Sequence, residues 1–289
     1  MPAYAKLYAE TRMLTPKARG DAFVERYAAA HPDFYLPGMF GNVTEQKARA
    51  ERYFDPRQRR QFPGFPPLTD DRVLALAKTV GPQFLAEQKR FAETFPDFAC
   101  GTEVEFAPSL MVFDGHADLV KGKKYLLFGV DMIAMIHGPD DMPTVFDHEL
   151  FHLYHLQVLT GQPPEGQDPT WWSMWVEGLA TYVSQRMNPA RDAQQVLVFP
   201  SDMVARMKTQ ESRGARLMLD DIDKTGADAS RWFDTGNSVE GLPQRAGYYY
   251  GYLFARSIGA GKSLPDLARL PPALVHAQAV AFLKKLAAR

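Results

Sequence analysis

Residues 147–157, DHELFHLYHLQ, place three histidines and a glutamate inside a run of large apolar side chains. Apolar residues on nearly all sides predict a buried helix over residues 144–159. Buried imidazoles and a buried carboxylate are costly unless a partner satisfies them. This segment therefore constrains the fold more than any other, because the rest of the chain must cover the helix and supply that partner.

The spacing of His148 and His152 indicates that the partner is a metal ion. Residues four apart on a helix are about 40° apart around its axis, so both imidazoles face the same side. The string HELFH matches the pattern H-E-x-x-H. In this pattern the two histidines bind one Zn²⁺, and the glutamate, here Glu149, lies beside the open coordination position. The alternative is a core helix whose histidines are hydrogen-bonded within the protein.

A catalytic zinc ion needs a third protein ligand, and Glu177 is the candidate. After a turn-rich break at residues 161–170, the segment WWSMWVEGLATYVSQRM (171–187) predicts a second helix. Glu177 is the single acid in the apolar stretch 174–183 of that helix. The short connection favours side-by-side packing of the two helices, and Gly178 and Ala180 permit close approach. A solvent-exposed glutamate is the alternative.

Two other polar residues of the first helix are candidates for supporting the ligands or contacting a substrate. His155 lies about 10 Å along the helix axis from His148, which is too far for the same metal ion. It is expected either to support the ligands or to be a hydrogen-bonded core residue. Asp147 directly precedes the first ligand, although an acid near a helix N-terminus is favoured by the helix dipole alone.

These motifs resemble the gluzincin metallopeptidases, in which the H-E-x-x-H helix is followed by a helix that carries a glutamate ligand. The run from VFDHELFHLYH to RAGYYYGYLFARS is similar to bacterial predicted zinc-dependent proteases. The string EGLATY is closest to the aminopeptidase N-like branch, and the resemblance covers roughly residues 125–263. It implies zinc ligation by His148, His152 and Glu177, with Glu149 as the general base.

The resemblance also implies a tyrosine that stabilises the oxyanion, three residues before a glycine. Tyr248 stands three residues before Gly251, and Tyr249 is the alternative. The same tyrosine-rich helix is also consistent with plain core packing, and Arg245 is a further candidate for contacting the substrate. The G-x-M-E-N loop of the aminopeptidases has no counterpart in FGVDMIAMIHG, where Asp131 has a different spacing. The resemblance therefore does not imply strict aminopeptidase activity.

Hydrophobic periodicity predicts an α+β fold that is mostly helical. Residues 1–100 are expected to form an N-terminal helical lobe, with a long helix capped by residues 69–71. Residues 101–289 are expected to form a zincin-like domain, with a small, mainly antiparallel sheet followed by the H-E-x-x-H helix and C-terminal helices.

The expected sheet contains three or four strands from the segments TEVEFAP, SLMVFDG, ADLVKG and KYLLFGVDMIAMI. The strand at about residues 125–130 is expected to be an unpaired edge, to which an extended peptide adds beside the metal. Another short strand is expected at residues 196–199.

Composition limits the partners. With 33 basic and 34 acidic residues, the net charge of −1 does not favour nucleic acid or anionic lipid. No apolar stretch approaches the ~20 residues of a membrane span, and the first residues lack the apolar core of a secretory signal. We expect a soluble protein, cytoplasmic as the chain stands, or periplasmic or secreted if a leader was removed. The single cysteine, Cys100, excludes an intramolecular disulfide and is expected to be a buried small apolar residue.

These features together predict a zinc metallopeptidase that holds one Zn²⁺ per chain and acts on a peptide or protein substrate. One alternative is a metal-binding scaffold that binds peptides without catalysis, and another is a hydrolase of non-peptide amides or esters. Glu149 argues against the scaffold, because a purely structural site needs no base there. The sequence indicates neither the substrate nor the oligomeric state.

Overall fold

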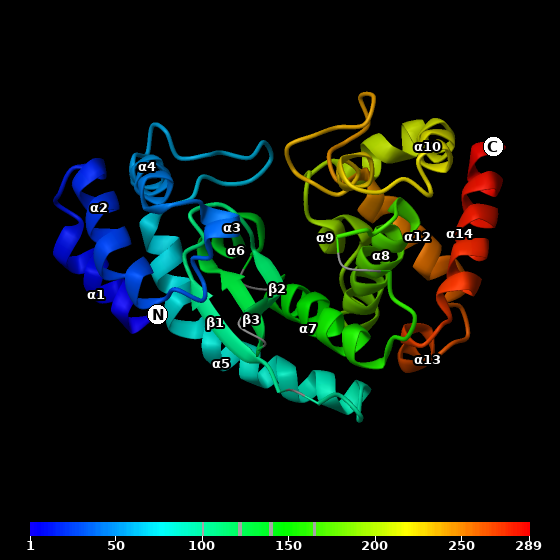
Figure 1. Cartoon of the computed structure of the whole chain (residues 1–289), viewed down its shortest axis with the longest axis horizontal. Coiled ribbons are helices and arrows are strands. Elements are labelled where there is room, and N and C mark those ends of the chain that lie inside the picture. The colour runs from blue at the N-terminus through cyan, green and yellow to red at the C-terminus, as the bar shows by residue number, and fades with distance from the viewer. Residues whose placement is uncertain (100, 121–122, 139–140, 164–165) are drawn as a thin grey trace. The chain divides into compact units, whose positions relative to one another are not determined.

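The computed structural model describes residues 1–99, 101–120, 123–138, 141–163 and 166–289, so the expected burial of Cys100 lies outside the described residues. In chain order the elements are α1 (Pro2–Thr11), α2 (Pro16–Arg26), the 3-10 helix η1 (Ala28–Ala30), α3 (Pro37–Phe40), α4 (Val43–Phe54), α5 (Asp70–Thr94), β1 (Glu103–Ala107), β2 (Gly115–Val120), β3 (Lys123–Gly129), α6 (Val130–Ile136), α7 (Met142–Val158), α8 (Thr170–Met187), α9 (Ala193–Leu197), α10 (Met203–Asp220), α11 (Ala227–Ser230), α12 (Ala246–Ile258), α13 (Leu264–Ala268) and α14 (Pro272–Ala287) (Figure 1). This mostly helical arrangement with one small sheet confirms the predicted α+β class.

The chain packs into two compact units. The first contains residues 1–87 and 100–142, and the second contains residues 88–99 and 143–289. The sheet therefore belongs to the same unit as the N-terminal helices, and the last part of α5 belongs to the second unit. This division differs from the expected boundary at residue 100, because residues 100–142 pack with the N-terminal helices.

The first unit is built on an aromatic core between α2 and α4. Phe23 is fully buried and packs edge-on against Tyr35 and Phe54, with ring centroids 5.6 and 5.7 Å apart. A Cβ at Gly20 would lie only 2.8 Å from the backbone nitrogen of Glu51, so the two helices cross in close contact. Large rings thus fill the space that the close helix pair encloses.

The sheet of the described residues has three strands in the order β1-β3-β2. β1 pairs with β3 in parallel, with Val104 opposite Leu126, and β2 pairs with β3 in antiparallel register, with Ala117 opposite Leu126. The sheet is thus mixed, and not mainly antiparallel. The prediction that the strand at 125–130 is an unpaired edge was wrong: β3 is central, with a partner on each side, because it inserts between the two strands that precede it.

Three further strand predictions were wrong. In SLMVFDG the buried carboxylate of Asp131 accepts hydrogen bonds from the backbone N–H groups of Ser109 (2.6 Å) and Met111 (2.8 Å), so a tight turn replaces a strand. Asp131 lies in the first turn of helix α6, which begins at Val130, so the strand expected to continue through VDMIAMI ends at Gly129. Residues 196–199 follow the capping box of Asp192 and Gln195, which starts the helix α9 instead.

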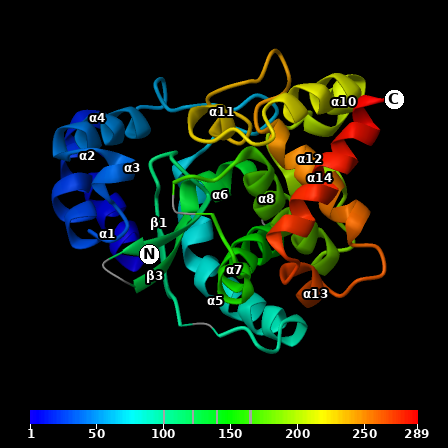
Figure 2. The ribbon, with the colours of Figure 1, turned by 45° about the vertical axis from the view of Figure 1, so that its right-hand side comes forward.

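In the second unit, α8, α10, α12 and α14 pack together around a buried core (Figure 2). Trp175 of α8 and Phe254 of α12 are fully buried, with ring centroids 5.6 Å apart. None of the helices that the described residues form has the length and apolar character needed to span a membrane. This unit also contains residues 143–158 of α7, and α7 and α8 carry the residues expected to bind a metal.

Candidate metal centre

Two histidines of α7 bring their imidazoles together on one face of the helix. The Nε2 atoms of His148 and His152 lie 3.0 Å apart, and their ring centroids lie 4.6 Å apart. Four residues make slightly more than one helical turn, which places the two rings one above the other. On the other faces Leu150 and Phe151 are fully buried, so the apolar core fixes which side of the helix the histidines occupy.

Glu177 of α8 brings a carboxylate to the same point. Its Oε2 atom lies 3.4 Å from Nε2 of His148 and 3.5 Å from Nε2 of His152. Within the described part of the chain, these side chains form the one group of His, Cys, Asp or Glu residues whose ligand atoms come close enough to hold a metal ion. The structure therefore brings together the three residues that the sequence predicts as ligands.

The distances between the donor atoms suit a tetrahedral metal ion. For ligand bonds of about 2.0–2.1 Å, the edges of a tetrahedron measure about 3.3–3.4 Å. The donor atoms here are separated by 3.0, 3.4 and 3.5 Å. Two imidazole nitrogens and a carboxylate oxygen are ligand types that suit Zn²⁺. The side chains are 14–24% exposed, so water can reach the group.

The charges around the three residues favour an ionised glutamate. Burial raises the pKa of Glu177, but the charge of His152 and the hydrogen bond with His148 outweigh it and hold this pKa well below its usual range. Burial lowers the pKa of His152, but the carboxylates of Glu177 and Glu149 outweigh it and raise this pKa to about 9. Burial holds the pKa of His148 below its ordinary value. The imidazoles thus hold a proton that a metal ion would displace on binding.

Glu149, the predicted general base, follows the first histidine and is 9% exposed. Its charge contributes to the raised pKa of His152, which means that the carboxylate lies near the triad. It does not belong to the group of residues whose ligand atoms converge. Glu149 is thus near enough to influence His152 but is not one of the converging ligand residues.

A buried ion pair links α7 to the end of α8. The guanidinium of Arg90 pairs with the fully buried carboxylate of Asp147 and also donates a 2.6 Å hydrogen bond to the carbonyl oxygen of Met187. The Asn188 side-chain amide donates a 2.7 Å hydrogen bond to the same carboxylate. Asp147 therefore does more than favour a helix N-terminus: it joins the two helices that carry the triad.

Sequence reasoning missed Arg90 and Asn188. The signal for a partner was present, because a carboxylate in an apolar helix needs a cation or donors. Nothing in the sequence indicated which of the 33 basic residues that cation is. A second link between the two helices is the 2.7 Å hydrogen bond from the Ser184 hydroxyl to the carbonyl oxygen of Thr144. The sequence did not indicate this contact either.

The two candidate tyrosines have different surroundings in the structure. The ring of Tyr248 lies nearly parallel to the imidazole of His148, with centroids 6.5 Å apart, and the guanidinium of Arg245 lies over it, 3.9 Å from the ring centroid. Burial and the charge of Glu177 raise the pKa of the Tyr248 hydroxyl, which therefore stays protonated. The hydroxyl of Tyr249 donates a 2.8 Å hydrogen bond to Glu211 instead. Tyr248 and Arg245 thus lie at the triad, whereas Tyr249 is engaged elsewhere.

A close crossing of α8 and α12 brings Tyr248 to this position. A Cβ at Gly178 would lie 2.1 Å from the carbonyl carbon of Gly251, and a Cβ at Gly251 would lie 2.2 Å from the carbonyl oxygen of Met174. The two backbones touch because neither helix has a side chain there. The expectation that Gly178 permits close approach is met, but the helix that approaches is α12.

His155 does not belong to the group of converging ligand atoms. It is 2% exposed and packs against Phe151 and Trp175, with ring centroids 5.3 and 6.3 Å away. Burial and the nearby His152 lower its pKa to about 3, so the ring is neutral. Among the described residues its Nε2 atom has no hydrogen-bond partner. His155 is a core residue here.

Comparison of the chain with protein-family models, with curated proteins and with solved structures found no match.

Proposed function

We propose that this protein holds one Zn²⁺ through His148, His152 and Glu177 and hydrolyses amide bonds in peptides or proteins. The observation that carries the proposal is the convergence of two imidazole nitrogens and one carboxylate oxygen, at separations of 3.0–3.5 Å, from two different helices. The resemblance of HELFH and WVEGLATY to gluzincin metallopeptidases supports the same reaction.

Each neighbouring residue has a role that its placement supports. A bound Zn²⁺ polarises a carbonyl oxygen and lowers the pKa of water toward about 7. The Glu149 carboxylate accepts a proton from the attacking water and delivers it to the leaving nitrogen. The protonated hydroxyl of Tyr248 donates a hydrogen bond to the carbonyl oxygen as negative charge develops on it. Arg90, Asp147 and Asn188 hold the two ligand helices together.

The test combines metal analysis with one substitution. Protein purified without added metal should contain about one equivalent of zinc, and a peptide library incubated with it should be cleaved. The variant Glu149→Gln should keep the zinc and lose three or more orders of magnitude in turnover, because it removes both the base and the acid. The control is Glu93→Gln, which changes an exposed acid on α5.

Each failure points to a different alternative. Folded protein that cannot be loaded with zinc contradicts the metal site itself. Zinc-loaded protein that binds library peptides without cleaving them supports the non-catalytic scaffold. Cleavage of simple amides or esters but of no peptide supports the other hydrolase class. Near-normal turnover in Glu149→Gln contradicts the assigned base.

A further inference from the structure

A second group of charged residues lies in the first unit, around a pocket of about 150 Å³. Arg49 and Arg52 of α4 line the pocket together with Arg60 of the loop that follows this helix. Tyr53 and Gln58 add polar atoms to the same wall. Among the described residues no carboxylate lines the pocket, so the charge of this lining is positive.

The remaining wall of this pocket is apolar and rigid. It is formed by Leu110 and Met111, whose φ angles of 54° and 67° lie in the left-handed region that such residues rarely adopt. The buried carboxylate of Asp131 holds this turn through the backbone N–H groups of Ser109 and Met111. Strained backbone of this kind persists only where its surroundings enforce it, and it is concentrated at binding sites.

The three arginines of the pocket have no ion pair with any described carboxylate, although acids lie nearby. Glu45 accepts a hydrogen bond from the backbone of Asn42, and Asp55 accepts hydrogen bonds from Gln58 and from the backbone of Arg57. Burial, and then the charge of Arg52, lower the pKa of Arg49. Its Nε atom is buried without a hydrogen-bond partner in the described part of the chain. An anion in the pocket would supply a counter-charge for this guanidinium.

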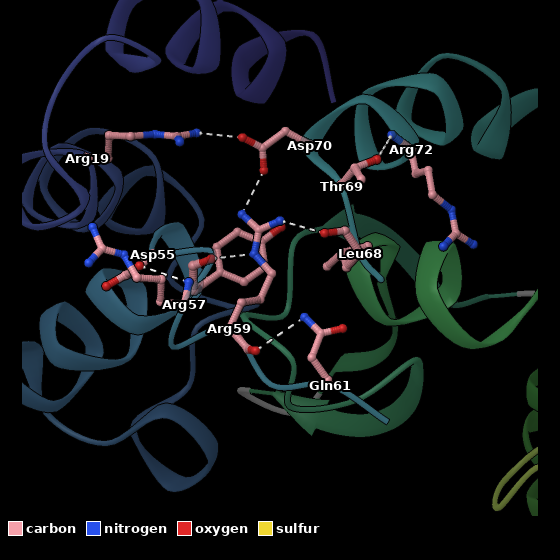
Figure 3. A network of polar contacts seen from close by, with 10 residues as sticks. Arg19, Asp55, Arg57, Arg59, Gln61, Leu68, Thr69, Asp70 and Arg72 are labelled. Carbon is pink, nitrogen blue, oxygen red and sulfur yellow. Dashed lines mark hydrogen bonds and ion pairs between the residues drawn. The ribbon is translucent and has the colours of Figure 1, made fainter. Parts of the chain in front are cut away.

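Two neighbouring arginines of the same unit, by contrast, do pair with a carboxylate. The buried Arg59 donates to Asp70 (2.8 Å) and to the carbonyl oxygens of Tyr53 (2.6 Å) and Leu68 (3.0 Å), and Arg19 pairs with the same aspartate (Figure 3). In this network one carboxylate, that of Asp70, pairs with two guanidinium groups, and the contacts of Arg59 hold the loop that carries Gln58 and Arg60. The three pocket arginines instead have no carboxylate partner among the described residues, and Arg60 stacks on the ring of Phe62, 4.4 Å from its centroid.

We propose that this pocket binds a small organic anion, with a carboxylate or phosphate group on Arg49, Arg52 and Arg60 and an apolar body against Leu110 and Met111. Guanidinium groups form paired hydrogen bonds with both kinds of anion. A cavity of about 150 Å³ accommodates a body the size of benzene. The site is independent of the proposed zinc chemistry, because every residue that lines it belongs to the first unit.

The experiment titrates the full-length protein with phenyl phosphate, benzoate, inorganic phosphate and neutral benzamide, at constant ionic strength, by isothermal calorimetry. Saturable binding of phenyl phosphate or benzoate is expected, and the stronger of the two identifies the head group. Benzamide lacks the charge and inorganic phosphate lacks the apolar body, so both should bind at least tenfold more weakly. Equal binding of benzamide or of inorganic phosphate would overturn the proposal.

Variants then test the residues. Arg49→Gln should weaken binding of the better anion about 10- to 100-fold, because one hydrogen bond to a charged group contributes about 1.5–3 kcal/mol. Arg60→Gln, at an exposed position, provides the same test if Arg49→Gln does not fold. Arg57→Gln removes an equal charge from the same loop without touching the pocket and should bind as the wild type does. Absence of saturable binding, or equal weakening by Arg57→Gln, contradicts the site.

Discussion

Two adjacent tyrosines show how far surroundings decide what a residue can do. Tyr248 and Tyr249 have the same side chain, but consecutive helical residues point about 100° apart. The first lies beside His148 and under Arg245, and the second donates its hydroxyl to Glu211. Burial and the charge of Glu177 raise the pKa of the Tyr248 hydroxyl, which therefore keeps its proton and can act as a hydrogen-bond donor.

Replacing Tyr248 with phenylalanine should therefore lower kcat and leave binding nearly unchanged. The ring under Arg245 remains, and only the hydroxyl that serves the transition state is lost. We expect kcat to fall by about 10²–10³, with little change in KM or zinc content, measured on a peptide that the library identifies. Tyr249→Phe is the matched control and should keep kcat within about threefold. Equal kinetic losses in both variants would contradict the assignment.

At the scale of elements, the site depends on the packing of helices more than on any single helix. α7 contributes two of the proposed ligands, α8 contributes the third, and α12 places Tyr248 beside them. Arg90 and Asn188 link α7 to α8 through Asp147, and the contact of Gly178 with Gly251 joins α8 to α12. A substitution that breaks either link should therefore weaken metal binding.

Gly178→Ala tests the second link. The added methyl group would lie 2.1 Å from a backbone carbon of α12, so the helices must separate. We expect unfolding to become easier by about 1–3 kcal/mol, seen as a lower Tm, together with weaker zinc binding in a chelator competition. Gly38→Ala is the control, since a Cβ there meets no atom within 4 Å. Wild-type Tm and zinc affinity in Gly178→Ala would show that α8 and α12 are not locked together by this contact.

At the scale of the whole molecule, the two units should respond differently to metal. The triad and all residues linked to it belong to the second unit, whereas the sheet and the arginine pocket belong to the first. Metal that binds the folded state alone stabilises it by about 2.7 kcal/mol at 100 times Kd. That stabilisation acts on the helices that hold the ligands.

Chelation of zinc should therefore speed amide hydrogen exchange in α7 and α8 and leave exchange in β1, β3 and α4 unchanged. The reason is that removal of the ion leaves the two imidazoles and the carboxylate of Glu177 without the metal–ligand bonds that would join α7 to α8 at this point. Mass spectrometry of exchange with and without a chelator measures this. The double variant His148→Ala/His152→Ala should show no response to the chelator. A uniform change along the chain would contradict a metal confined to the second unit.

Local sequence patterns correctly predicted the helix that carries His148 and His152. Most of the wrong predictions concerned features that depend on packing between distant parts of the chain. The apolar run around His148 and His152 predicted the helix and the shared face correctly, because helical periodicity depends only on neighbours in the chain. The strand at 125–130 was identified but its neighbours were not, because pairing partners lie far away in sequence. SLMVFDG has strand-forming residues, yet the distant Asp131 holds its backbone N–H groups in a turn.

The sequence by itself determined the helix of HELFH, the apolar helix around Glu177, the mostly helical class and the absence of a disulfide within the chain. Each of these follows from composition or from a repeat of a few residues. Only the tertiary structure decided that Glu177 reaches both histidines, that Tyr248 and not Tyr249 lies beside them, and that Arg90 is the cation of Asp147. Those outcomes depend on how helices far apart in the chain touch, and contacts such as that of Gly178 with Gly251 arise only once the core has closed around them.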